Sequence, residues 1–119
     1  MRLDQLIEKV KQHPDFDRVG MLLCHNGVVR GTSRDGRRTS GLKVSVDHHR
    51  LEEVVAAQKK RPGIVEILVH INENQPLAVG DDVMFIVVAG DIRENVIETL
   101  RDTLNAIKSS VTSKTEFFV

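Results

Sequence analysis

Four arginines in one short segment are the first residues of this chain whose types and spacing suggest chemistry. Arg30 directly follows an apolar stretch, and Arg34, Arg37 and Arg38 lie close behind it, with Asp35 as the only acid among them. A guanidinium can hold a phosphate or a carboxylate through two parallel hydrogen bonds. Since the whole chain carries 17 basic and 17 acidic residues, the excess of positive charge in this segment is local. The segment is therefore a candidate anion site, and the alternative is an ordinary exposed hairpin loop.

Further cations lie towards the C-terminus. Arg93 is expected in the first turn of a long helix, where the helix dipole disfavours a positive charge, so a nearby anion would explain it. Lys108 is expected at the end of the same helix, and Lys114 lies in the irregular segment that follows. A lysine ammonium can stabilise a developing oxyanion or exchange protons. The alternative for Arg93 and Lys108 is plain solvation at the surface.

Other kinds of site lack a matching pattern. The sequence contains no glycine loop of the nucleotide-binding type, and no serine has an aligned base. Asp47, His48 and His49 form the only cluster that resembles a metal site, but neighbours at a helix start point in different directions. No aromatic residue near the loop arginines could stack on a base. We therefore expect no metal, no cofactor and no nucleic-acid partner.

The elements that must position these cations form an α+β pattern. Apolar spacing predicts, in order, a helix over 3–12, strands over 18–30 and 42–46, a helix over 48–60, strands over 64–71 and 83–89, a helix over 92–108 and an edge strand at the TEFFV tail. We expect the first two strands to form a hairpin around Asp35-Gly36, and the next two to pair likewise. The result is a mostly antiparallel sheet with helices packed on one face.

Local signals refine this arrangement. Asp47 is expected to cap the second helix, and Asp91 the third, with Glu94 completing a capping box. A chain of 119 residues fits one domain, 1–119. Charges interrupt the apolar pattern of the N-terminal segment, so we expect no signal peptide. No uncharged apolar run approaches the roughly 20 residues of a membrane span. The expected location is the cytoplasm.

Seven segments, taken together, resemble a known family in their order and spacing. They are GMLLCHNGVVR, LKVSVDHH, ILVHI, VGDDVMFIVVAG, GDIREN, TLNAIK and VTSKTE. The match runs from about residue 19 to residue 116, and the segments resemble the large, catalytic subunit of molybdopterin synthase, the MoaE family. This resemblance implies an α/β hammerhead fold with an added β subdomain.

The resemblance also implies a function and the residues that perform it. MoaE proteins convert a cyclic pyranopterin monophosphate into molybdopterin by adding two dithiolene sulfurs. The sulfur arrives as a thiocarboxylate on the tail of MoaD, a ubiquitin-like small subunit, and the large subunit forms a homodimer. Lys108 and Lys114 match the catalytic lysines of the family, and Arg30 and Arg93 match positions suited to the substrate phosphate. The remaining loop arginines would lie near the substrate or in solvent.

The chain departs from the family pattern at several positions. Ile92 stands where the family has a histidine, and His25 stands where it has a phenylalanine. The VTSKTE segment lacks a proline, a tryptophan and one lysine, and the spacing between the two lysines is one residue short. The chain ends at Val119, where family members usually run on into the partner's site. Two expectations stay open: an active sulfur-transferring subunit, or an inactive relative that binds a ubiquitin-like tail or an anionic metabolite.

Overall fold

The strand β5 (Asp82–Gly90) is the centre of the computed structural model, which describes residues 1–119. It lies between β1 (Met21–Val28) and β3 (Ile64–Ile71) and pairs with both in antiparallel fashion. Alternate β5 side chains enter two separate clusters, Met84, Ile86 and Val88 on one face and Phe85, Val87 and Ala89 on the other. Because both faces are buried, the run of apolar residues is continuous, as predicted.

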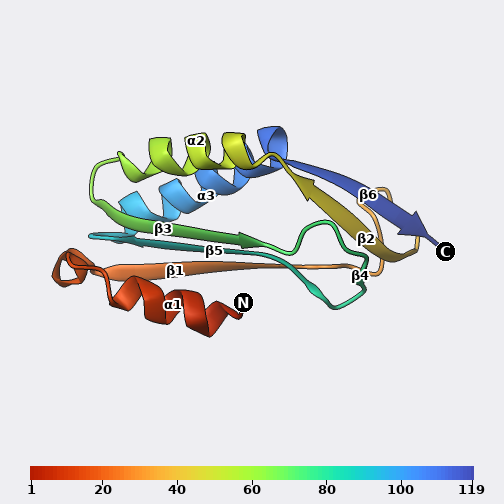
Figure 1. The fold of residues 1–119 in the computed structure, drawn as a ribbon, viewed down its shortest axis with the longest axis horizontal. Helices are drawn as coiled ribbons and strands as arrows, with labels where there is room; N and C mark the ends of the chain where they lie inside the picture. Colours follow the sequence, from red (N-terminus) through yellow and green to blue (C-terminus); the bar gives the residue numbers. More distant parts are fainter.

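Helices cover both faces of this sheet. α2 (His48–Lys59) and α3 (Arg93–Ser110) pack on one face, and α1 (Leu3–Lys11), followed by a 3-10 turn, η1 (Phe16–Arg18), lies on the other (Figure 1). The predicted α+β class is confirmed. The expectation that all helices share one face is wrong for α1, because the second apolar face of β5 also needs cover. None of the helices has the length and apolar composition needed to cross a membrane.

A second sheet extends from the end of the first and makes the molecule elongated, at 48 × 25 × 24 Å (Figure 1). In it β2 (Thr39–Val46) lies between the short β4 (Leu77–Ala78) and β6 (Thr112–Phe118). The predicted edge strand at the C-terminal tail is thus confirmed, and β4 falls in a segment that was expected to be loop.

The predicted hairpin between β1 and β2 is wrong. β1 pairs with β5 and β2 pairs with β6, both antiparallel, so the two strands belong to different sheets. The turn signal at Asp35-Gly36 closes only a short loop, held by a bridge between Thr32 and Arg38. A turn fixes its immediate neighbours, whereas strand pairing follows from which apolar faces can be buried together. The predicted pairing of β3 with β5 is confirmed.

The two predicted helix caps have different outcomes. The Asp47 side chain accepts a hydrogen bond from the Arg50 N–H at 3.0 Å and caps α2 as expected. The prediction for α3 is wrong, since Ile92 occupies its N-cap position and no side chain caps the helix. The Asp91 carboxylate instead accepts from the Ile92 N–H at 2.7 Å, one residue before the helix, so no capping box with Glu94 forms.

Candidate functional site

A cleft lies where the two sheets diverge, beside the C-terminal end of α3. It consists of two adjoining cavities, which share the lining residues Val28, Arg34, Leu42, Lys108 and Lys114. The His25 cavity, of about 390 Å³, is further lined by His25, Gly27, Val44, Val83, Met84 and Thr112. The Arg30 cavity, of about 300 Å³, is further lined by Arg30, Thr32, Ser33, Thr39 and Glu116. One half of the cleft is therefore richer in apolar side chains, and the other is mostly polar.

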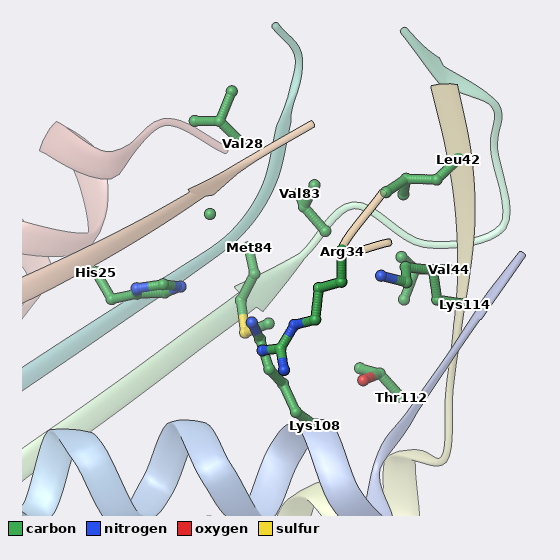
Figure 2. Close-up of a pocket in the computed structure, with 11 residues that line it drawn as sticks. His25, Val28, Arg34, Leu42, Val44, Val83, Met84, Lys108, Thr112 and Lys114 are labelled. Atoms are coloured by element: carbon green, nitrogen blue, oxygen red, sulfur yellow. The ribbon is translucent and has the colours of Figure 1, made fainter. Parts of the chain in front are cut away.

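Two consecutive elements bring the predicted lysines together. Lys108 lies in the last turn of α3, and Lys114 lies on β6, which starts directly after the helix. Side chains on a strand alternate between faces, so Thr112, Lys114 and Glu116 share one face, and all three line the cleft. Figure 2 shows Lys108 and Lys114 entering the His25 cavity from the helix and the strand, with Arg34 between them.

The cleft has a strong positive bias. Its cationic side chains are Arg30, Arg34, Lys108 and Lys114, and its only carboxylate is Glu116. Lys114 Nζ lies 3.8 Å from the Glu116 carboxylate, and the lysine side chain is about half exposed, so the pair is weak. Arg30 Nε donates to the Thr32 carbonyl at 3.0 Å, which leaves its terminal nitrogens for a ligand. The arrangement suits an anionic group such as a phosphate.

His25 also lines the cleft, opposite the cations. Its Nε2 is buried and has no hydrogen-bond partner. Burial, and secondarily the positive charge of Lys108, lower the pKa of the His25 imidazole, so the ring is neutral at pH 7. Gly27, at a register shift in β1, leaves room for the ring, since a Cβ there would lie 3.3 Å from His25 Nε2.

Arg93 does not line the cleft. It lies at the opposite end of α3 from Lys108, roughly 22 Å away at 1.5 Å per residue. Its guanidinium is exposed and pairs with Glu94 at 3.2 Å. Of the four cations that were expected to converge, Arg30, Lys108 and Lys114 line one cleft within the chain, and Arg93 does not.

The loop arginines take different positions. Arg34 lines both cavities, whereas the Arg37 guanidinium lies 3.7 Å above the Phe118 ring and Arg38 lines neither cavity. Asp35 organises this turn, since its carboxylate accepts hydrogen bonds from Ser33 and from the Arg37 N–H, and these lower the pKa of Asp35. Of the three arginines, only Arg34 is placed to meet a ligand in the cleft.

The histidines of the Asp47-His48-His49 cluster make surface contacts. His48 Nε2 lies 2.8 Å from Glu73, and His49 Nε2 lies 3.5 Å from Glu53. No group of three or more potential metal ligands occurs in the structure. The cluster therefore contributes a helix cap and two histidine–carboxylate contacts at the surface.

Comparison with known proteins identifies the family. The family model for the MoaE protein matches residues 1–110. The chain belongs to the MoaE family. The chain matches none of the curated proteins with which it was compared.

Solved structures of MoaE proteins and molybdopterin synthases have the same fold as this chain. Molybdopterin synthase from Staphylococcus aureus matches with a TM-score of 0.81 at 19% identity, over 100% of this chain and 86% of that one. Molybdopterin cofactor biosynthesis protein E from Burkholderia multivorans matches with a TM-score of 0.78 at 18% identity, over 100% of this chain and 84% of that one. A complex of subunits 1 and 2 of the molybdopterin-converting factor from Helicobacter pylori matches with a TM-score of 0.72 at 15% identity, over 100% of this chain and 84% of that one. The expected MoaE fold is confirmed.

Several residues of the MoaE cleft were missed from the sequence. Thr112 and Glu116 lie two residues either side of Lys114, so the two-residue period of a strand would have found them had β6 been predicted to start at Thr112. His25 was noted only as a departure from the family pattern. No signal in the sequence marks its Nε2 as unpaired, because that depends on which strands lie beside β1.

Proposed function

We propose that this chain is the catalytic subunit of a molybdopterin synthase, which transfers sulfur from a thiocarboxylated small subunit to a cyclic pyranopterin monophosphate. Membership of the MoaE family gives the chain a role in molybdenum cofactor biosynthesis. The observation that carries the finer proposal is the convergence of Lys108 and Lys114 with two arginines on one cleft.

The cleft divides the work between its charged groups. Arg30 and Arg34 border the Arg30 cavity and would hold the substrate phosphate through charge-assisted hydrogen bonds. Lys108 and Lys114 border both cavities. They would therefore lie between the phosphate and the rest of the substrate, beside the carbons that receive sulfur.

Both lysines would act on charge that develops during transfer. The thiocarboxylate sulfur forms a bond to a substrate carbon in place of a carbon–oxygen bond, whose oxygen leaves as water or remains on the phosphate. Water then cleaves the acyl–sulfur bond, leaving a carboxylate on the small subunit and sulfur on the substrate. Each thiocarboxylate delivers one sulfur, so a dithiolene consumes two. An ammonium beside the acyl oxygen stabilises the oxyanion formed in the hydrolysis, and Lys108 and Lys114 are the groups available for this.

The proposal includes an assembly. A ubiquitin-fold small subunit of the MoaD type would deliver its C-terminal tail to the cleft. The matching Helicobacter pylori structure is a complex of two different subunits, which supports such a partner. We further propose that residues 1–119 act as one MoaE domain, that the large subunit is a homodimer, and that it works in the cytoplasm.

One assay tests the chemistry. The purified chain is mixed with a thiocarboxylated small subunit and the cyclic pyranopterin monophosphate, and the dithiolene product is followed by mass spectrometry. The proposal predicts two sulfurs added per substrate molecule. No product, under conditions where the Staphylococcus aureus synthase turns over, would overturn it.

A second candidate is a MoaE relative that binds the anion or the tail without chemistry. The observation in its favour is the position of Arg93, which matches the family pattern but lies away from the cleft and pairs with Glu94. This candidate predicts binding of the pyranopterin, or of the small subunit, with no sulfur transfer. Calorimetry beside the assay above distinguishes the two functions.

A further inference from the structure

His25 is the one cleft residue with a buried side-chain polar atom that has no hydrogen-bond partner in the protein. Its Nε2 is shielded from solvent and has no hydrogen-bond partner. A buried polar group without a partner destabilises a fold, and native structures rarely keep one. In Figure 2 the ring points from β1 towards the middle of the His25 cavity. A ligand in that cavity could supply the missing partner once it displaces the side chains that cover Nε2.

The groups that face the ring define what such a partner must be. Lys108 is the charged neighbour on the α3 side, and no carboxylate lines the His25 cavity. Val44, Val83 and Met84 surround the remaining space. A neutral imidazole carries one donor and one acceptor nitrogen. A matching ligand group is therefore a ring that packs against these apolar side chains and presents hydrogen-bonding groups at its edge, as a pterin heterocycle does.

The two cavities separate this contact from the anion contact. Arg30 lines only one cavity and His25 only the other, while Lys108 and Lys114 line both. A ligand with phosphate at one end and a heterocycle at the other would span the cleft. Its phosphate would meet the arginine, and its ring would meet the histidine.

We propose that His25 is a specificity-determining residue of this cleft, whose Nε2 forms a hydrogen bond with the heterocycle of the bound pterin. The inference rests on the proposed function for the identity of the ligand. It adds a residue that recognises the ring, in contrast to the arginines, which would recognise only charge.

Calorimetry with two probes tests the role. The probes are cyclic pyranopterin monophosphate and inorganic phosphate, and the proteins are the wild type, His25→Phe and His25→Gln. Loss of one ligand hydrogen bond should weaken pyranopterin binding about tenfold in His25→Phe, while phosphate affinity should stay within about twofold. His25→Gln, which keeps a donor and an acceptor, should bind pyranopterin within about threefold of the wild type. Melting temperatures verify folding, and His25→Leu replaces the phenylalanine variant if the larger ring disrupts the strand.

The possible outcomes separate this inference from the proposed function. If wild type and His25→Phe bind pyranopterin equally, or if His25→Phe loses both probes alike, the histidine does not recognise the ring. If the wild type binds no pyranopterin, both proposals are wrong. If the expected affinities are found but no sulfur is transferred in the assay, the role of His25 stands and the catalytic proposal is wrong.

Discussion

At the residue scale, the cleft combines cations whose side chains are held to different degrees. Arg30, just after β1, is held at both its side chain and its backbone. Its Nε donates to the Thr32 carbonyl, and its own carbonyl accepts from the Thr39 hydroxyl at 2.8 Å. Lys114 is held only by a weak pair with Glu116. A fixed arginine suits a phosphate that must be positioned, and a freer lysine suits a charge that appears only during the reaction.

We expect Lys108→Ala and Lys114→Ala each to slow sulfur transfer by about 100-fold or more, because each removes a group that stabilises the developing oxyanion. The measurement is the initial rate of dithiolene formation at saturating small subunit. Lys43→Ala is the matched control, since Lys43 is an exposed lysine on β2 that lines neither cavity. A Lys108→Ala enzyme that keeps the rate of the control would contradict this role.

We expect Arg34→Ala to weaken binding of inorganic phosphate by about tenfold, as loss of a charge-assisted hydrogen bond does. Arg93→Ala serves as the comparison, because Arg93 is also exposed but lies at the far end of α3. It should leave the affinity unchanged. Calorimetry at low salt measures both, and equal losses in the two variants would show that the effect is one of net charge alone.

At the element scale, helix and strand positions could be predicted closely from the sequence, but strand partners could not. The continuous apolar run of β5 correctly indicated cover on both faces. The turn at Asp35-Gly36 suggested a hairpin, yet β1 joins β5 because both carry apolar residues on two faces. The length of the predicted helix already indicated that Arg93 and Lys108 lie far apart, and this indication was missed. Lys108 follows Arg93 by fifteen positions along α3, which is too far for both to line this cleft in one chain.

α3 also contains a destabilising feature, two buried hydroxyls without partners, and a single substitution can remove one of them. Thr99 and Thr103 are buried against the sheet, and neither hydroxyl has a hydrogen-bond partner. We expect Thr103→Val to raise the free energy of unfolding by about 1 kcal/mol, because a methyl replaces an unsatisfied polar group. Urea unfolding measures this. Thr103→Ser, which keeps the hydroxyl and removes the methyl, should be less stable than the wild type, and a stabilised serine variant would contradict the explanation.

At the scale of the whole molecule, ion pairs join elements that are distant in sequence. Arg61, just after α2, donates to Asp102 on α3 at 2.7 Å. The Arg61 hydrogen bond is the main reason that the pKa of Asp102 is lowered. A carboxylate with a lowered pKa in the folded state takes up its proton more readily when unfolded. Its contribution is therefore present above about pH 4, the unfolded value, and is lost as pH falls through the folded value.

We expect Arg61→Gln to be less stable than the wild type at pH 7 and to lose less stability on acidification. Urea midpoints between about pH 2 and 7 measure this difference, which should shrink towards the acid end as Asp102 protonates in both proteins. Arg101→Gln is a suitable comparison, since Arg101 contacts the same carboxylate but is more exposed and contributes less to its pKa. Parallel curves for wild type and Arg61→Gln would rule out the pair as a source of acid sensitivity.

The junction between α3 and β6 has a consequence for which mutations this protein can tolerate. Val111, which is buried, ends the helix, and the strand begins at the next residue, so the same few residues set the distance and the direction from Lys108 to Lys114. Adding or deleting one residue there would turn Lys114 to the opposite side of the strand, along with its neighbours on that side. Lys114 lines the cleft although its spacing from Lys108 is one residue shorter than in the family pattern, so any further insertion or deletion in this stretch would need a compensating change nearby.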